Sequence, residues 1–100
     1  MPGYPTKSDK ELIYAISKLK GEKEITGFLH DLLTPAEIEE FSRRFQIAKL
    51  LWTTEKSYFV IAEKVGTSTT TVTRVAQWLF KERWQGYSVV LKRIFGSSER

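Results

Sequence analysis

Apolar residues recur at helical spacing along most of the chain, and no segment alternates long enough to predict a β-strand. The first periodic stretch runs from Ser8 to Lys20, where Ser8 is the expected N-cap with Glu11 three residues later. Gly21 is expected to end this helix, and a second, shorter helix is expected from Glu24 to Leu33. Its apolar face is made of Ile25, Phe28, Leu29 and Leu32.

The third helix has a strong start signal. Thr34 supplies a capping oxygen, Pro35 has the backbone angle of the first helical position, and Glu37 adds an acidic group to the first turn. The apolar positions that follow are Ile38, Phe41, Phe45, Ile47, Ala48, Leu50, Leu51 and Trp52. The helix is therefore apolar over much of its circumference, and we expect it to form the centre of the fold.

Three more helices are expected in the second half of the chain. Ser57 caps a helix over residues 58–65 that Gly66 interrupts, another begins near Ser68, and the last covers residues 87–95. The expected buried stripe of the fifth helix is Val72, Val75, Ala76, Leu79 and Phe80. The pattern therefore predicts an all-α fold of about six helices.

Composition supports one compact domain. The chain has 100 residues, of which 41% are hydrophobic and 28% are charged, and it has no cysteine for a disulfide or a thiolate zinc site. We expect a domain over residues 8–95 between a flexible arm, 1–7, and a flexible tail, 96–100. Neither a signal peptide nor a membrane span is apparent, so a cytoplasmic protein is expected. The apolar stripes are too broad for one such chain to bury, which predicts a homodimer.

Charge is distributed unevenly along the chain. Residues 1–42 hold five basic and eight acidic groups, whereas residues 43–100 hold eleven basic and four acidic groups. A basic half of this kind is typical of proteins that bind a polyanion.

Residues 58–75 have the spacing of a helix-turn-helix. Ala62 is small where two helices would cross steeply, and Gly66 suits the tight turn between them. The wedge between the helices would be filled by Val65, Val72 and Val75. The first turn of the second helix would then enter the major groove of DNA. The alternative interpretation is an ordinary helical hairpin with a threonine-rich cap.

The polar residues of this segment are the candidate DNA contacts. Threonine hydroxyls and methyl groups can meet base edges, and lysine and arginine can meet phosphates. We expect base contacts from Thr69, Thr70 and Thr71, and contacts nearer the backbone from Ser68, Thr73, Lys56 and Lys64. Arg74 is the one strong charge on the second helix.

Other candidate sites are weaker. His30 and Asp31 are neighbours whose side chains should diverge by about 100° on a helix, and no second His or Cys exists to complete a metal site. No phosphate-binding, dinucleotide or nucleophile-elbow motif is present, so we expect neither an enzyme nor a cofactor. The acidic group Glu37, Glu39 and Glu40 is read as a helix start rather than as paired catalytic acids. The aromatic group Trp78, Phe80, Trp84 and Tyr87 is read as core or interface rather than as a platform for RNA bases.

One long stretch begins at residues 33–37 and runs through Arg44 to residues 66–74, and three shorter stretches are residues 11–19, 28–32 and 86–94. Together they resemble the Trp repressor superfamily, and the fit is best to its YerC/YecD-type branch. The resemblance covers residues 8–95. It implies an intertwined helical homodimer whose first three helices and last helix form a shared core, with the fourth and fifth helices reading DNA.

The resemblance also implies a set of ligand-pocket positions. Arg44 and Arg74 stand where tryptophan-responsive members keep two arginines that hold the ligand. Val75 replaces a glycine there and Trp78 replaces a serine, and both are expected to fill the pocket. Arg44 is instead expected to pair with Glu40, and Arg74 to face solvent or phosphate.

The expected function is therefore a dimeric regulator, most simply a repressor, that binds roughly palindromic double-stranded DNA without tryptophan. The alternative is a protein-interaction or RNA-binding adaptor that keeps the fold without operator recognition.

Overall fold

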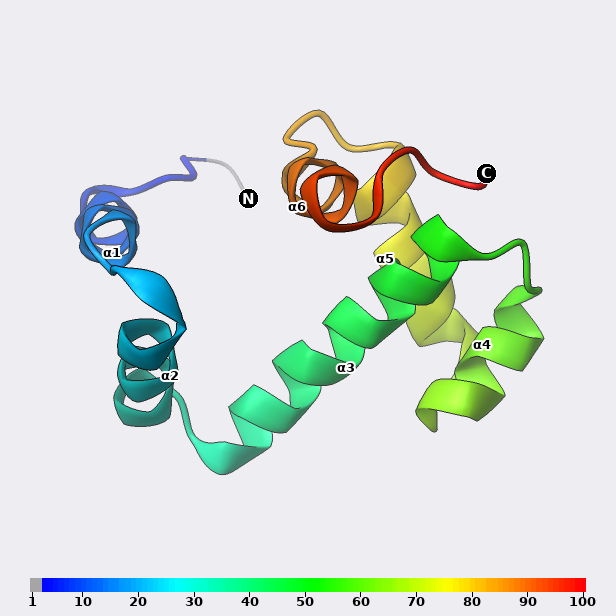
Figure 1. Ribbon diagram of the computed structural model, residues 1–100, viewed down its shortest axis with the longest axis horizontal. Coiled ribbons are helices and arrows are strands. Elements are labelled where there is room, and N and C mark those ends of the chain that lie inside the picture. The colour runs from blue at the N-terminus through cyan, green and yellow to red at the C-terminus, as the bar shows by residue number, and fades with distance from the viewer. Residues whose placement is uncertain (1–2) are drawn as a thin grey trace. The chain divides into compact units, whose positions relative to one another are not determined.

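Six α-helices make up the regular structure of residues 3–100, which are the residues that the computed structural model describes (Figure 1). They are α1 (Lys7–Ser17), α2 (Gly21–Leu32), α3 (Pro35–Thr53), α4 (Tyr58–Val65), α5 (Thr69–Phe80) and α6 (Gly86–Phe95). No strand occurs among these residues, so the all-α prediction is confirmed. Within the same range, no helix is both long and apolar enough to cross a bilayer. Residues 1 and 2 of the predicted arm lie outside the described residues.

One compact unit extends to Ile38 and contains α1, α2 and the start of α3. Helix α1 begins earlier than predicted, because Thr6 and Asp9 form the reciprocal capping pair that was expected of Ser8 and Glu11. The Thr6 hydroxyl accepts from the Asp9 N–H at 3.2 Å, and the Thr6 N–H donates to the Asp9 carboxylate at 2.8 Å.

Helix α2 also begins before its predicted start. Gly21, expected to end the first helix, is the first residue of α2, while α1 already ends at Ser17. The Glu24 carboxylate accepts the Lys20 N–H at 2.8 Å and so satisfies a donor at the helix start. Neither α1 nor α2 contains a buried residue, although both helices carry apolar side chains.

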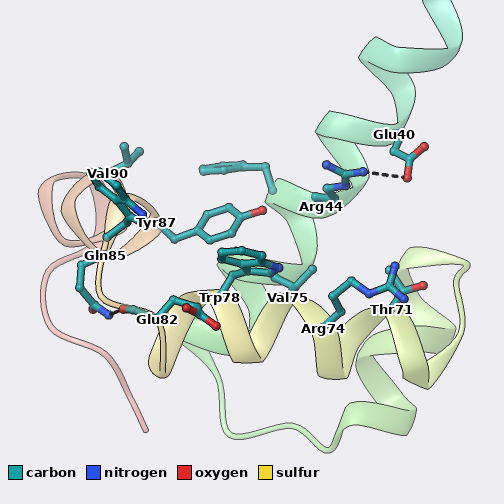
Figure 2. A pocket seen from close by; sticks show the side chains of 13 residues that line it. Glu40, Arg44, Thr71, Arg74, Val75, Trp78, Glu82, Gln85, Tyr87 and Val90 are labelled. Atoms are coloured by element: carbon teal, nitrogen blue, oxygen red, sulfur yellow. Dashed lines mark hydrogen bonds and ion pairs between the residues drawn. The ribbon is translucent and has the colours of Figure 1, made fainter. Parts of the chain in front are cut away.

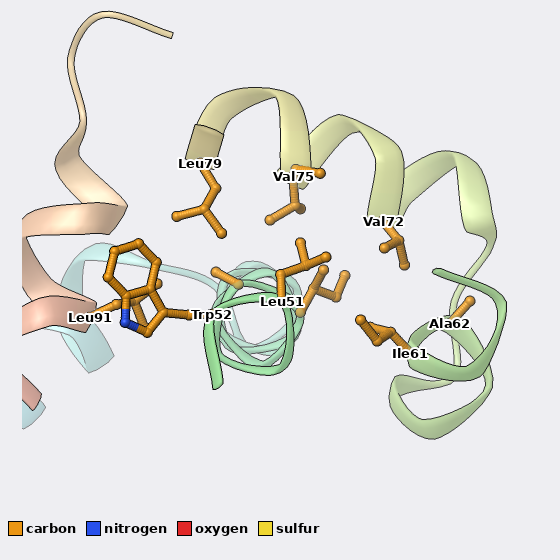
Figure 3. Close-up of a cluster of buried hydrophobic side chains, with 11 residues drawn as sticks. Leu51, Trp52, Ile61, Ala62, Val72, Val75, Leu79 and Leu91 are labelled. Atoms are coloured by element: carbon orange, nitrogen blue, oxygen red, sulfur yellow. The ribbon is translucent and has the colours of Figure 1, made fainter. Parts of the chain in front are cut away.

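The hydrophobic core lies in the second compact unit, Glu39–Arg100. It is built from Ile47, Ala48, Leu51 and Trp52 of α3, Ile61 and Ala62 of α4, Val72, Val75, Ala76 and Leu79 of α5, and Leu91 of α6. Figure 3 shows Leu51 near the middle of this cluster, between side chains of α4 and α5. Burial on α3 is thus confined to its C-terminal half.

Two aromatic residues at apolar positions of α3 and α5 are exposed. Phe80 was expected in the buried stripe of α5 but is 38% exposed, and Phe41 of α3 is 46% exposed. Phe80 is the last residue of α5, where the chain turns away, while Phe41 precedes the part of α3 that the other helices cover.

The α4–α5 pair follows the predicted bounds. The Ser57 hydroxyl caps α4 by accepting from the Val60 N–H at 3.2 Å. The backbone of Gly66 has φ +79°, and its N–H donates to the Ala62 carbonyl at 2.9 Å. This left-handed residue closes α4 and permits a turn of three residues, 66–68, before α5.

Replacing Gly66 with alanine tests this turn. No heavy atom lies within 4 Å of the added Cβ, so the variant changes only the backbone preference at φ +79°. We expect Gly66→Ala to lower the free energy of unfolding by about 1 kcal/mol, measured by urea denaturation. Gly86→Ala is the control, since Gly86 also has open space but no positive φ, and its stability should not fall. Equal stabilities for the two variants would contradict the assigned role of Gly66.

Candidate nucleic-acid interface

The first turn of α5 is rich in hydroxyl groups and contains no acidic residue. Thr69 and Thr70 are exposed, and within the described part of the chain neither hydroxyl has a hydrogen-bond partner. Both side chains are therefore free to contact a partner. The helix start also carries the partial positive charge of its unpaired N–H groups, which favours an anion.

The other hydroxyls of this segment have partners within the chain. The Ser68 hydroxyl accepts from the Thr71 N–H at 3.2 Å and lies 3.1 Å from the Thr71 hydroxyl. The Thr73 hydroxyl donates to the Thr69 carbonyl at 3.0 Å. Thr71, predicted to contact bases, is only partly exposed. These bonds leave Thr69 and Thr70 as the residues with uncommitted donors.

Three of the predicted phosphate contacts are exposed cations. Lys56 lies in the connection before α4, Lys64 in the last turn of α4, and Arg74 in the second turn of α5. Among residues 3–100, none of the three forms an ion pair with a carboxylate. Their positive charges are thus available to phosphates.

A cavity of about 730 Å³ lies between α3, α5 and α6 (Figure 2). Its lining includes all four predicted ligand-pocket positions, namely Arg44, Arg74, Val75 and Trp78. Thr71 and Arg74 belong both to this wall and to the beginning of α5. The cavity volume falls in the range of small-molecule sites in proteins.

Val75 is buried in the core, and Trp78 is 50% exposed on the cavity wall. That these two side chains exclude a tryptophan ligand stays a prediction. In Figure 2, the Trp78 indole and the Tyr87 ring extend into the cavity from α5 and α6. The chain therefore lines the cavity with its own large aromatic groups.

The predicted ion pair of Arg44 is confirmed. Its guanidinium donates to the Glu40 carboxylate at 3.2 Å, one turn earlier on α3. The positive charge of Arg44 also acts on Tyr87. Burial raises the pKa of the Tyr87 hydroxyl above its ordinary value, and the Arg44 charge partly opposes that rise.

The sequence pattern did not place the far wall of the cavity, which is the part lined from the α5–α6 connection and α6. That wall consists of Glu82, Trp84, Gln85, Gly86, Tyr87 and Val90. Gln85 adopts a left-handed backbone, φ 55°, just before α6, and no periodic pattern could reveal the course of this connection. The only sequence signal for this wall was the aromatic group that includes Trp84 and Tyr87. Trp78 is half exposed and Trp84 is 57% exposed, so neither is a core residue of the single chain, and their place in an interface stays a prediction.

The remaining polar candidates lie on the surface. The ring of His30 and the carboxylate of Asp31 are 3.1 Å apart, closer than the expected divergence, and both side chains are more than four-fifths exposed. Glu37 accepts the Thr34 N–H at 2.9 Å, which confirms its place in the helix start. Glu39 pairs with Arg43 at 3.1 Å. In the described range, no three His, Cys, Asp or Glu side chains gather as a metal site would need.

Comparisons with known proteins agree on one family. The Trp repressor protein family matches residues 7–95. A TrpR like protein from Eubacterium eligens ATCC 27750 is 37% identical with a TM-score of 0.78, and the match covers 90% of this chain and 91% of that chain. A putative Trp repressor from Staphylococcus aureus is 32% identical with a TM-score of 0.79, over 91% of this chain and 89% of that chain. Among curated proteins, none matches.

Proposed function

Because the chain belongs to the Trp repressor family, we propose that it is a transcriptional repressor that binds specific sequences of double-stranded DNA. The observation that carries the proposal is the first turn of α5, which is exposed, free of acidic residues and preceded by a three-residue turn from α4. A helix-turn-helix presents its second helix in this way.

In this proposal α5 enters the major groove with its N-terminal end. Thr69 and Thr70 contact base edges, because their hydroxyls have no partner within the described residues. Lys56, Lys64 and Arg74 neutralise phosphates and fix the register of the helix on the duplex. Ser68 and Thr73 contribute near the backbone, while their hydroxyls also stabilise the helix start.

The proposed assembly is a homodimer. The support is the lack of any buried residue in α1 and α2, whose apolar side chains need a covering surface. The exposed ones include Leu12, Ile13, Ile16, Ile25, Leu29 and Leu32. A second copy related by a two-fold axis would place two α5 helices about 34–36 Å apart, one turn of DNA, so the target is roughly palindromic.

DNA binding is proposed to be independent of tryptophan. A free amino acid would have to draw Arg44 away from Glu40 to bind its own carboxylate there. Its indole would also meet the Trp78 and Tyr87 rings that already extend into the cavity. A ligand changes DNA affinity only if it binds the DNA-bound form of the protein more tightly or more weakly than the free form.

Selection of bound fragments from genomic DNA tests the main proposal. We expect enrichment of a palindrome whose half-sites are centred about one helical turn apart. The matched control is the same selection with the double variant Thr69→Ala/Thr70→Ala, which should weaken the base preference within the enriched sequence. Tight capture of RNA without an enriched duplex sequence would instead support the adaptor alternative.

Base and phosphate contacts should respond differently to substitution. Thr70→Val keeps the size of the side chain but removes its hydroxyl, and we expect a loss of about 1–3 kcal/mol against the preferred base pair at one position. Lys64→Ala should weaken binding to all sequences alike and flatten its salt dependence. Competition binding on single-base variants of the site measures both effects. Thr26→Val, an exposed threonine of α2, is the control. If Thr70→Val behaved like Lys64→Ala, the groove placement would be wrong.

Light scattering at micromolar concentration measures the assembly. We expect twice the chain mass of 11.6 kDa. Ile16→Glu should shift the protein towards the monomer, because a charge on the uncovered apolar face of α1 opposes its burial. Lys23→Glu changes an exposed polar position of α2 and should leave the dimer intact. A monomeric parent protein would exclude the proposed assembly.

Calorimetric titration with L-tryptophan tests the ligand proposal. We expect no saturable heat, and the same affinity for the selected DNA with and without the amino acid. A leucine titration is the control for dilution heats. Micromolar binding that also tightens DNA binding would show that the protein is gated by tryptophan after all.

A further inference from the structure

Residues 96–100, named here the C-terminal strap, are hydrogen-bonded to the end of α3 and to the connection that leads to α4. The Trp52 indole N–H donates to the Gly96 carbonyl at 2.7 Å, and the Glu99 N–H donates to the Trp52 carbonyl at 2.9 Å. The Arg100 guanidinium donates from Nε to the Leu51 carbonyl at 2.7 Å, and from Nη2 to the Lys56 carbonyl. The strap therefore joins segments that lie more than forty positions earlier in the chain.

The strap supplies hydrogen-bond donors to two carbonyls at the C-terminus of α3. The last carbonyls of a helix have no partner inside it and need donors from elsewhere. In α3 these are the carbonyls of residues 50–53, and the first of them, on Leu50, accepts from the Thr54 N–H at 3.1 Å. The next two, on Leu51 and Trp52, accept from Arg100 and Glu99.

Charge gives Arg100 a second role at this helix end. The C-terminus of a helix carries partial negative charge, and a nearby cation stabilises it. The last turn of α3 contains no basic residue, so Arg100 supplies the cation from outside the helix. The strap thus brings both hydrogen-bond donors and a cation to the end of α3.

The second carbonyl held by Arg100 lies on the other side of the connection. Lys56 immediately precedes Ser57, whose hydroxyl caps α4 and whose carbonyl accepts the Ile61 N–H at 3.0 Å. The planar guanidinium is a rigid fork of donors. By holding Leu51 and Lys56 together, it fixes the distance between the end of α3 and the start of α4.

We propose that Arg100 is a positioning residue for the α4–α5 pair: its guanidinium bridges the two ends of the α3–α4 connection and so sets the pose in which α5 meets DNA. This inference rests on the proposed DNA-binding function. Arg100 acts through the connection and contacts no DNA itself. The C-terminal strap is then part of the recognition apparatus, although it lies outside the sequence segment that carries the base contacts.

DNA affinity and its salt dependence test this role at a temperature where circular dichroism shows every variant folded. We expect Arg100→Ala to weaken binding to the selected palindrome about fivefold, the size of one net hydrogen bond, because the bridge between the Leu51 and Lys56 carbonyls is lost. The slope of the logarithm of affinity against the logarithm of salt concentration should not change, because no phosphate contact is lost.

Arg100→Lys keeps the charge but lacks the fork, and should restore little of the affinity. Arg93→Ala, which removes the same charge from an exposed position of α6, is the matched control and should not weaken binding comparably.

Two results would overturn the proposal in this assay. One is an unchanged affinity for Arg100→Ala, which would leave the strap with no part in DNA binding. The other is a loss of affinity that is accompanied by a salt slope about 0.9 lower, which would make Arg100 a phosphate contact, or that is fully rescued by lysine, which would leave the guanidinium bridge without a role.

Hydrogen exchange of the free protein separates this inference from the proposed function. In Arg100→Ala, we expect faster exchange of the Val60 and Ile61 amides, which bond to Ser57 at the start of α4. The exchange rate of the Gly96 amide, which is bonded to the Lys92 carbonyl at the end of α6, should change less.

If the parent protein bound no DNA, the proposed function would fail, while the exchange data would still test the positioning role of Arg100. Unchanged exchange at α4, or equal acceleration at every amide, would contradict the positioning role.

Discussion

Burial of one face of α3 is the constraint on which the rest of the second unit depends. Ile47, Ala48 and Leu51 have no exposed surface, and side chains from α4, α5 and α6 form one cluster with them. A close-packed cluster of this kind allows few alternative arrangements, since any shift of a helix opens voids or clashes. The exposed first turn of α5 is therefore held by contacts on the opposite face of the same helix, where Val72 is buried.

Local signals predicted much of the fold. The Thr34 cap, the Ser57 cap and the left-handed Gly66 all have the predicted roles, because capping and turn chemistry depend on residues a few positions apart. The predicted start of α1 was wrong, because Thr6 and Asp9 form the same kind of capping pair two residues earlier than Ser8 and Glu11. The periodic pattern also could not separate apolar faces that the chain covers itself from those it leaves exposed. That difference depends on how distant segments pack, which a local pattern does not contain.

In the candidate site, too, the features that lie on single helices could be predicted from the sequence, and those that depend on connections could not. The hydroxyl-rich start of α5 and the pair of Arg44 with Glu40 followed from spacing on single helices. Residues contributed by connections were missed, because the course of a connection depends on backbone angles and distant partners. Tyr87 reaches the cavity only after the left-handed Gln85 redirects the chain into α6. The strap contacts of Arg100 likewise join positions too far apart in sequence for any periodic pattern to link.

Arg74 and Thr71 belong both to the wall of the cavity and to the start of α5. A molecule in the cavity and a nucleic acid on α5 would therefore share side chains, and each would alter the free energy with which the other binds. Thermodynamic linkage requires the two effects to be equal: whatever factor the cavity occupant imposes on DNA affinity, DNA imposes on the occupant. Changes at cavity residues such as Trp84 and Val90 would thus alter the affinity for a cavity ligand while Thr69 and Thr70 stay the same.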